Sequence, residues 1–231
     1  MSKNFFNSIN TILVTGGLGF IGSAYVKKIL QDTNIQIVNI DKEGYASNKE
    51  CIDKCLEKLD SYKLNNYYHY KADLKDFETI NKIIIKSKPE MIVHFAAESH
   101  VDRSIDNPRT FLENNILGTF NILEATRFFY KHLSKQKQEN FKFHHISTDE
   151  VYGSLGKSGT FHEKTPYNPR SPYSATKASS DHLVNAWFHT YGIPVIVSNC
   201  SNNFGPWQLP DKLIPLVICK AIKDELIPIY G

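Results

Sequence analysis

The feature of this sequence that most constrains its fold is the regular alternation of short β-type runs with longer helical patterns. Strand-like runs cover Thr11–Thr15, Ile35–Ile40, Tyr67–Lys71, Met91–Phe95, Lys142–Ser147 and Val195–Asn199. Apolar residues at helical spacing recur in Ile21–Leu30, Phe77–Lys86, Thr110–Leu133, Ala175–Tyr191 and Leu213–Asp224. This order is typical of a parallel sheet covered by helices. We therefore predict a Rossmann-type, doubly wound α/β fold with helices on both faces of the sheet.

The segments between these elements complete the predicted organisation. Ser134–Asn140, rich in Lys, Gln and Glu, is predicted to be a solvated connection, and Gly153–Arg170 a long loop beside the functional site. The apolar run Leu226–Tyr230 resembles a further strand, and a domain seldom ends on a fresh strand. We assign residues 1–200 to a dinucleotide-binding domain and 201–231 to the start of a small C-terminal substrate domain that is largely absent.

Composition narrows the class of protein. The chain has 231 residues, of which 41% are hydrophobic and 22% charged, and its lysines are scattered around a net charge of +3. This balance argues against nucleic-acid binding, although it suits an anionic small molecule. No run approaches the roughly 18 apolar residues of a membrane span, and Met1–Asn10 has no signal-peptide pattern.

The four cysteines are Cys51, Cys55, Cys200 and Cys219. The first two lie one helical turn apart, which would suit half of a metal site. No second pair or histidine cluster accompanies them, so we expect free intracellular thiols, no metal and a cytosolic location.

The first chemical motif is Thr15-Gly16-Gly17-Leu18-Gly19-Phe20-Ile21-Gly22, which runs from a predicted strand into a predicted helix. Glycine permits a tight turn and lets the backbone come close to a pyrophosphate. The following helix presents free N–H groups and the positive end of its dipole. An ordinary glycine turn is the alternative, but the context favours a phosphate cradle.

Two aspartates favour NAD as the cofactor. Asp41 ends the second strand about 20 residues beyond the glycines, where a carboxylate accepts hydrogen bonds from the adenosine ribose. A 2′-phosphate there would meet like-charge repulsion, which argues against NADP, although Lys42 would partly offset it. Asp73, which ends the third strand, would bond the adenine amino group.

Tyr173 and Lys177 lie four residues apart in Ser171-Pro172-Tyr173-Ser174-Ala175-Thr176-Lys177. In the first turn of a helix, both side chains would lie on one face. A phenol has a pKa of about 10, and a nearby ammonium and a positive nicotinamide would favour the phenolate. A tyrosine and a lysine at this spacing also occur often by chance.

Thr148, Asp149 and Glu150 follow a predicted strand, at the edge where ligands bind in open α/β sheets. Two adjacent acids there would work as an acid and a base on neighbouring carbons of one substrate. A solvated Asp–Glu turn is the alternative interpretation.

With His94–Ser104 and Asn199–Pro206, these motifs resemble the extended short-chain dehydrogenase/reductase family, and within it the dTDP-glucose 4,6-dehydratases. The resemblance covers nearly the whole chain, and Thr148-Asp149-Glu150 is its specific element. In related 4-epimerases the two positions after the hydroxyl residue usually carry small or neutral side chains. In UDP-glucuronate decarboxylases a glutamate is usual, but the aspartate is not.

The resemblance implies a role for each catalytic candidate. Tyr173, supported by Lys177 and Thr148, would take the proton of the sugar 4-hydroxyl as C4 is oxidised. The resulting ketone acidifies the C5 hydrogen, which Glu150 would remove, while Asp149 protonates the departing 6-hydroxyl. Reduction at C6 would give a 4-keto-6-deoxy sugar and leave NAD unchanged overall.

The motifs and the resemblance together give the binding candidates. For the cofactor NAD they are Gly16, Gly19, Phe20, Ile21, Gly22, Asp41, Lys42, Asp73, Leu74, Ala96, Ala97, Glu98, Asn114, Tyr173, Lys177 and Asn203. For a nucleotide-diphosphate sugar they are Ser99, His100, Thr148, Asn202, Lys212, Leu213, Pro228, Ile229 and Tyr230. An ordinary exposed lysine is the alternative for Lys212, and a buried polar network is the alternative for His100.

The sequence also departs from the family pattern. Glu43-Gly44 stands where Leu-Thr is usual, and Asn114 where threonine is common. The alternative functions are a 4-epimerase, a decarboxylase or a non-catalytic NAD-binding module, and the base of the substrate stays open between dTDP and UDP. The resemblance further implies a homodimer in which Thr110–Leu133 and Ala175–Tyr191 form a four-helix contact.

Overall fold

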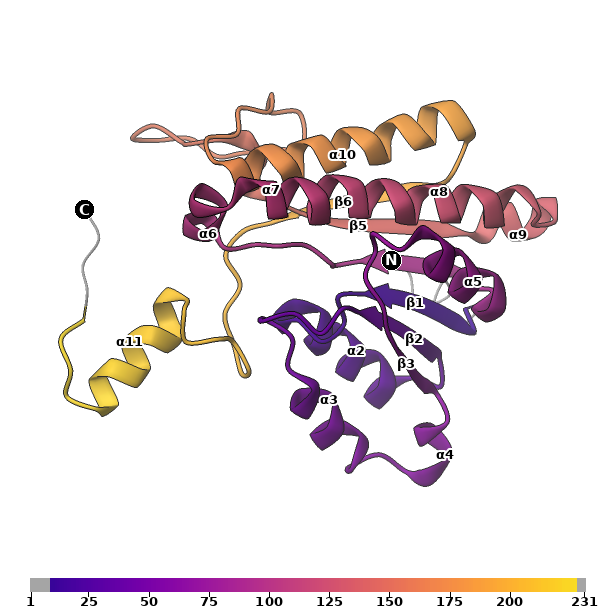
Figure 1. The fold of residues 1–231 in the computed structure, drawn as a ribbon, viewed down its shortest axis with the longest axis horizontal. Helices are drawn as coiled ribbons and strands as arrows, with labels where there is room; N and C mark the ends of the chain where they lie inside the picture. The colour runs from indigo at the N-terminus through magenta and orange to yellow at the C-terminus, as the bar shows by residue number, and fades with distance from the viewer. Residues whose placement is uncertain (1–8, 228–231) are drawn as a thin grey trace.

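A computed structural model describes residues 9–227 and contains one six-stranded sheet. Its strands are β1 (Thr11–Thr15), β2 (Gln36–Asp41), β3 (Tyr67–Lys71), β4 (Met91–His94), β5 (Lys142–Thr148) and β6 (Val195–Cys200). All neighbouring strands are parallel, in the order β3-β2-β1-β4-β5-β6 (Figure 1). The predicted doubly wound sheet is confirmed, and each predicted strand end agrees to within one residue.

Helices cover both faces of this sheet. The structure contains α2 (Phe20–Asp32), α3 (Lys49–Leu56), α4 (Ser61–Leu64), α5 (Phe77–Ser87), α6 (Val101–Asp106), α7 (Pro108–Phe111), the π-helix η1 (Leu112–Leu117), α8 (Gly118–Lys131), α9 (Lys135–Asn140), the 3₁₀ helix η2 (Asp149–Tyr152), α10 (Pro172–Tyr191) and α11 (Leu213–Ile222). Figure 1 shows α2 and α3 on one side of the sheet and α5, α8 and α10 on the other, with α11 apart from it.

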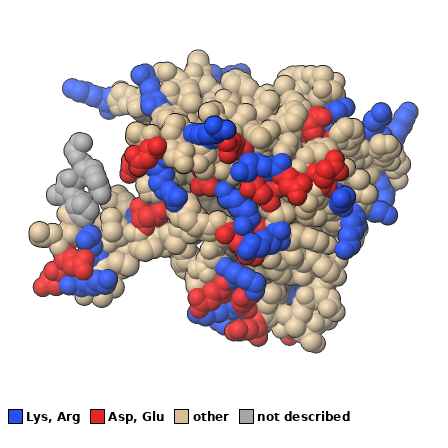
Figure 2. Space-filling model, viewed as in Figure 1, with Lys and Arg blue, Asp and Glu red and all other residues tan. Residues whose placement is uncertain are grey.

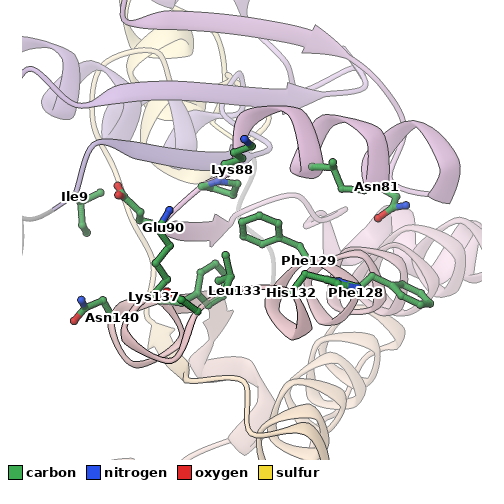
Figure 3. Close-up of a pocket in the computed structure, with 14 residues that line it drawn as sticks. Ile9, Asn81, Lys88, Glu90, Phe128, Phe129, His132, Leu133, Lys137 and Asn140 are labelled. Atoms are coloured by element: carbon green, nitrogen blue, oxygen red, sulfur yellow. The ribbon is translucent and has the colours of Figure 1, made fainter.

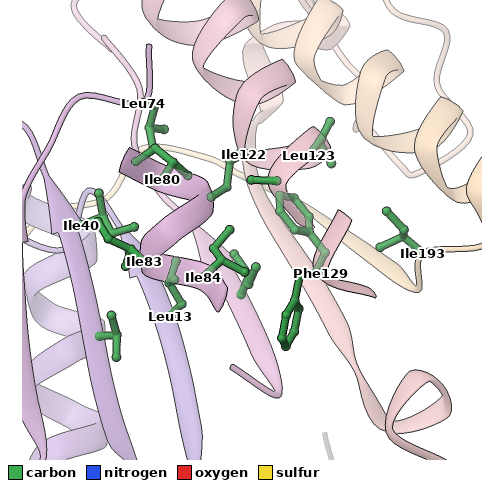
Figure 4. Close-up of a cluster of buried hydrophobic side chains, with 14 of the residues drawn as sticks. Leu13, Ile40, Leu74, Ile80, Ile83, Ile84, Ile122, Leu123, Phe129 and Ile193 are labelled. Carbon is green, nitrogen blue, oxygen red and sulfur yellow. The ribbon is translucent and has the colours of Figure 1, made fainter. Parts of the chain in front are cut away.

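The two-sided burial of the central strands explains this arrangement. Alternate residues of a strand point to opposite faces, so Leu13 of β1 packs under α5 and α8, whereas Ile12 and Val14 pack under α2. The buried cluster that contains Leu13, called here the first cluster, packs side chains of β1, β2, β4 and β5 against helices α5, α8 and α10 (Figure 4). Both faces therefore have to be covered, which requires the crossover helices that the sequence alternation predicts.

Two segments in the middle of the chain differ from the prediction in detail. The predicted helix Thr110–Leu133 is confirmed as continuous helical structure to Lys131, but α7 and α8 are joined by the π-helix η1, which was not predicted. Within η1, the side chain of Asn115 donates to the Glu98 carbonyl at 3.0 Å and accepts from the Glu98 amide at 2.8 Å. This tertiary bond accounts for an extra residue in the turn, as π-bulges at functional sites often do.

The segment Ser134–Asn140 is also not a plain connection, since Lys135–Asn140 forms the exposed helix α9. Its sequence has no apolar face, and Gln138 instead bonds the Tyr130 carbonyl at 2.9 Å. For the predicted strand at Leu226–Tyr230, Leu226 and Ile227 are in no regular element. The remaining residues 228–230 lie outside the described part of the chain.

Charges of both signs are mixed over the surface. On the face drawn in Figure 2, lysine and arginine alternate with aspartate and glutamate over the centre of the molecule. Many of these residues form exposed pairs one helical turn apart, such as Lys49 with Asp53 at 2.6 Å. Among residues 9–227, no helix combines the length and apolarity that crossing a membrane requires.

Ile80 and Ile85 of α5 provide a matched test of the core. Ile80 is fully buried in the first cluster, whereas Ile85 is 52% exposed. We expect Ile80→Ala to lower the free energy of unfolding by about 2–5 kcal/mol, because it removes buried methyl groups and leaves a cavity. Ile85→Ala should change it by less than about 1 kcal/mol. Urea denaturation would measure both, and equal effects would contradict this packing.

Candidate active site

The candidate site lies at the carboxyl edge of the sheet, where β1 and β4 are neighbours and the chain turns to opposite faces. Ligands bind at this switch point in open α/β sheets. Two adjoining cavities of about 110 and 300 Å³ lie there, and both are lined by Gly16, Gly19, Tyr45, Ala97 and Ser99 among others. One extends towards Asp41 and Asp73, and the other towards Tyr173 and Lys177.

The glycine loop forms the wall between β1 and α2. Gly16 has a φ of +72°, and a Cβ added there would lie 2.7 Å from the Ala96 backbone. A Cβ on Gly22 would lie 2.2 Å from the Gly16 carbonyl oxygen. No side chain caps α2 at Gly19, so the N–H groups of its first turn remain available at the cavity lined by Phe20 and Ile21. The loop thus has the backbone geometry of an anion cradle.

Asp41 braces this loop from the end of β2. Its carboxylate is 6% exposed and accepts hydrogen bonds from the Leu18 amide at 3.0 Å, the Glu43 amide at 2.8 Å and the Ser47 hydroxyl at 2.7 Å. A carboxylate offers about four lone-pair positions. Asp41 therefore has room for one further donor, and a fixed negative charge lies beside the cavity.

The ammonium of Lys42 is held on the other side of the same cavity. It lies 2.6 Å from the Glu98 carboxylate and 2.9 Å from the Asn114 amide oxygen. Because Glu98 already neutralises this charge, Lys42 would offset the repulsion between Asp41 and a 2′-phosphate less than the sequence alone suggested.

The catalytic candidates Tyr173 and Lys177 lie in the first two turns of α10. Ser171 caps this helix in a capping box with Ser174, and Pro172 occupies its first position. Tyr173 is 8% exposed and Lys177 is 4% exposed, and both line the larger cavity with Thr148 at the end of β5. The structure therefore brings together the tyrosine, the lysine and the threonine that the sequence had predicted to act together.

Burial controls the protonation of the tyrosine and the lysine. It raises the pKa of Tyr173, the negative charge of Glu150 raises it further, and a hydrogen bond with Thr148 opposes the rise. Burial lowers the pKa of Lys177 to about 8. In the chain alone, burial and Glu150 therefore outweigh the hydrogen bond with Thr148. The stabilisation of the phenolate by Lys177 together with a bound nicotinamide stays a prediction.

The two acids after Thr148 occupy different positions in η2. Glu150 is half-buried and lines the larger cavity with Tyr173. Burial raises the pKa of Glu150, Asp149 raises it further and Lys212 opposes them. Asp149 does not itself line either cavity, but its charge acts on both Glu150 and Tyr173. Glu150 therefore lines the same cavity as the phenol of Tyr173, whereas Asp149 lies outside the cavity lining.

Most of the predicted binding residues lie around these two cavities. The cofactor candidates on the smaller cavity are Asp41, Lys42, Asp73, Leu74, Ala96, Ala97, Glu98 and Asn114, and those on the larger are Phe20, Ile21, Gly22, Tyr173, Lys177 and Asn203. Among the substrate candidates, Ser99, Thr148, Asn202 and Lys212 line the larger cavity. His100 and Leu213 line neither, and Pro228, Ile229 and Tyr230 lie outside the described residues.

Several lining residues were missed by sequence reasoning. Tyr45 lies where both cavities meet, and the Arg103 guanidinium stacks on its ring at 3.6 Å. Cys200 and Asp211 line the larger cavity, and Asp211 lies 3.7 Å from His100. The position of Cys200 at the end of β6 was a usable signal, because carboxyl ends of parallel strands share one edge. Tyr45 and Asp211 lie in loops without a local pattern.

A larger cavity of about 690 Å³ lies at the opposite edge of the sheet (Figure 3). Ile9 and Glu90 before the strands, Asn81 of α5, Phe129 of α8 and Lys137 of α9 line it. It contains none of the predicted site residues. Among residues 9–227, no cluster of three or more His, Cys, Asp or Glu side chains suits a metal ion.

The family model described as GDP-mannose 4,6 dehydratase matches residues 13–231. The chain is similar to the dTDP-glucose 4,6-dehydratase of Neisseria meningitidis serogroup B, with 49% identity over 95% of this chain and 61% of the relative. The enzyme of the same name from Salmonella typhimurium is 50% identical over 95% of this chain and 62% of its own length. The chain thus spans about three-fifths of the length of these curated relatives.

Solved structures show the same similarity. A dTDP-glucose 4,6-dehydratase of Bacillus anthracis in complex with NAD matches with a TM-score of 0.82 and 40% identity, over 96% of this chain and 64% of that one. A UDP-glucose 4-epimerase of Thermotoga maritima matches with a TM-score of 0.81 and 26% identity, over 96% and 66%. The fold is therefore common to enzymes with different chemistry.

Two glycines test the geometry of the cradle. We expect Gly16→Ala to lower the free energy of unfolding by about 1–3 kcal/mol, because alanine is strained at positive φ and its Cβ would meet the Ala96 backbone. Gly156→Ala is the control, since nothing lies within 4 Å of a Cβ there. Urea denaturation of both variants would show the difference. Equal stability of the two variants would contradict the observed loop.

Proposed function

The chain belongs to the family described as GDP-mannose 4,6 dehydratase, and on this premise we propose that it is the nucleotide-binding part of a nucleotide-sugar 4,6-dehydratase. The proposed reaction converts dTDP-glucose or UDP-glucose into the 4-keto-6-deoxy sugar nucleotide and water. The observation that carries the proposal is that Glu150 lines the same cavity as Thr148, Tyr173 and Lys177, and that the charge of Asp149 acts on both Glu150 and Tyr173.

NAD is the proposed cofactor, and the residues present fit it. The glycine loop packs tightly enough that Gly16 and Gly22 admit no side chain, and the uncapped start of α2 borders the larger cavity, where a pyrophosphate would bind. Asp41 retains one acceptor position for a ribose hydroxyl, and its charge disfavours a 2′-phosphate. When bound, NAD supplies a reversible acceptor for the electrons of the sugar C4–H bond.

The chain's own residues supply the proton transfers. Tyr173 is proposed to take the proton of the sugar 4-hydroxyl, with Thr148 hydrogen-bonded to its phenol. A 4-ketone acidifies the neighbouring C5 hydrogen, which Glu150 removes. Asp149 protonates the leaving 6-hydroxyl, so that it departs as water. Return of the hydride to C6, and of a proton from Glu150 to C5, then gives the 4-keto-6-deoxy sugar and leaves NAD unchanged overall. Oxidation at C4 has to come first, because elimination without the ketone would create an unstabilised carbanion.

The raised pKa of Glu150 suits this role. A base is most effective when its pKa lies close to the working pH, and burial moves this carboxyl upward from its ordinary value. Lys212 opposes this shift, which places its ammonium near the reacting groups. We propose that Lys212 and Asn202 face the nucleotide-sugar, within a substrate region that starts at residue 201 and includes Pro228–Tyr230. A cytosolic location is also proposed, because all four cysteines are free thiols.

The acids also argue against the alternative functions. A 4-epimerase oxidises and reduces at C4 alone and has no use for an acid and a base directed at C5 and C6. A decarboxylase has no leaving hydroxyl for Asp149 to protonate. A non-catalytic NAD-binding module requires neither acid.

Turnover in deuterated water distinguishes these functions. We expect dTDP-glucose or UDP-glucose to give a 4-keto-6-deoxy product with deuterium at C5, because Glu150 exchanges that proton with solvent. Glu150→Gln and Tyr173→Phe should each lower kcat by about 10²–10⁴-fold. NMR and mass spectrometry would identify the product and its deuterium, and the rate of product formation would give kcat. A 4-epimer without deuterium at C5, or unchanged turnover in both variants, would refute the proposal.

We further propose a homodimer formed by α8 and α10. Large apolar side chains stay exposed on the two helices and on the preceding η1 turn, including Leu117 at 44%, Phe128 at 42% and Phe188 at 44%. Leu117, Phe120 and Phe128 share one helical face. In Figure 1 the two helices lie side by side on one face of the sheet, and their outer sides are available to a second copy.

Two leucines of similar exposure test this dimer. We expect sedimentation velocity at micromolar concentration to show a dimer, and Leu117→Asp to weaken it at least about tenfold by placing a charge in an apolar contact. Leu155→Asp in the long loop is the control, since Leu155 is 47% exposed outside the two helices. A monomer at this concentration, or equal effects of both substitutions, would reject the proposed interface.

A further inference from the structure

Next to Lys177 lies a polar cluster formed by His145, Ser147, Tyr167 and Asp181, of which only Ser147 lines the larger cavity. His145 and Ser147 come from β5, Asp181 from α10 and Tyr167 from the loop between η2 and α10. His145 and Asp181 are both 0% exposed. Charges are rarely buried without a partner. None of these four residues has a role in the proposed reaction, so the presence of a buried carboxylate at this place needs an explanation.

The distances connect the carboxylate to the lysine. Asp181 lies one helical turn after Lys177, but their charged groups do not pair directly within 4 Å. Instead, Nε2 of His145 lies 3.1 Å from Asp181 Oδ1 and 3.5 Å from Lys177 Nζ. Lys177 Nζ also donates to the Ile146 carbonyl at 2.8 Å. The ammonium is therefore fixed on its inner side by β5, and the imidazole lies between it and the carboxylate.

The second oxygen of Asp181 has two hydrogen-bond donors, whereas Oδ1 has only the 3.1 Å contact with His145. Oδ2 accepts a hydrogen bond from the Ser147 hydroxyl at 2.7 Å and another from the Tyr167 hydroxyl at 2.9 Å. Both donors favour the ionised carboxylate. Burial alone would raise the pKa of Asp181, but the contact with His145 and the bond from Ser147 outweigh it and hold this pKa below its usual range.

We propose that Asp181, one helical turn after Lys177 and fully buried, is the counter-charge that keeps Lys177 in its ammonium form. Only the use of this ammonium, which is to support Tyr173, rests on the proposed function; the charge of Lys177 itself does not. Two further features agree with the proposal. His145 stays neutral because burial and Lys177 lower its pKa to about 4, and Asp181 is the largest effect that opposes burial at Lys177.

Three other titratable groups near Lys177 do not supply this counter-charge. His94 of β4 is fully buried, and burial holds its pKa well below its ordinary value, so it is neutral. Cys200 of β6 acts on Lys177 only when ionised and is the smaller contributor. Tyr173 stays protonated in the chain alone because its pKa is raised. Asp181 is thus the group whose removal changes the charge next to the lysine.

The test is the titration of Lys177 itself, followed by NMR of ¹³C-labelled lysine side chains in the chain without substrate. Its resonance is identified by its loss in Lys177→Met. We expect a midpoint near 8 in the unsubstituted chain. Asp181→Asn keeps the shape of the side chain but removes the charge, and should lower this midpoint by about 1 unit or more.

Tyr167→Phe is the matched control, because it removes a hydrogen bond to the same carboxylate and leaves the charge in place. It should leave the midpoint of Lys177 nearly unchanged. A folded Asp181→Asn variant with an unchanged midpoint would overturn the proposal.

If Asp181→Asn does not fold, the carboxyl carbon of Asp181 in the unsubstituted chain supplies the test. It should report an ionised group throughout pH 5–9, and a protonated carboxyl at pH 7 would equally overturn the proposal. Neither titration requires turnover. A chain without dehydratase activity can therefore confirm this inference, and an active enzyme can refute it.

Discussion

The close approach of two backbones, between Gly16 after β1 and Ala96 after β4, is the contact on which the site depends. The two strands are neighbours, but the chain leaves them towards opposite faces of the sheet, so a crevice opens between the connections. A side chain at Gly16 would occupy that crevice. Everything that lines the two cavities, from Asp41 at one end to Tyr173 at the other, is placed relative to this contact.

Burial then acts on the ionisable groups of the site in one direction. It favours the neutral form of each, so the pKa values of Tyr173 and Glu150 rise and that of Lys177 falls. Fixed partners oppose this tendency, with Lys212 acting on Glu150, Thr148 on Tyr173 and Asp181 on Lys177. A positive ring bound near Tyr173 would add to the same opposition. We therefore expect the pKa of Tyr173 to be higher in the chain alone than in a chain with a cationic cofactor bound.

The sequence predicted the layers of the fold because parallel strands have to be apolar on both faces and crossover helices on one. It also predicted the edge where Thr148, Glu150, Tyr173 and Lys177 meet, since strand ends and helical spacing are local signals. It did not predict the π-turn at Asn115, which depends on a hydrogen bond to Glu98, 17 residues away. Nor did it predict the contact between His145 and Asp181, because a buried polar pair on two elements leaves no periodic pattern. Helices α9 and α4 were missed because they lack an apolar face, and α3 was missed although it buries Cys51, Ile52 and Cys55, because it has only eight residues.

The comparison with the 4-epimerase shows where specificity has to lie. That enzyme shares the fold of this chain at a TM-score of 0.81, about as well as the dehydratase at 0.82. The sheet and the glycine loop therefore do not distinguish oxidation at C4 from dehydration across C5 and C6. What distinguishes them is whether an acid and a base are available one and two carbons further along the sugar. In this chain Thr148, which contacts the phenol, caps the short 3₁₀ helix that contains Asp149 and Glu150. If the proposed function holds, the difference in reaction type depends on side chains of this short helix and not on the fold that the two enzymes share.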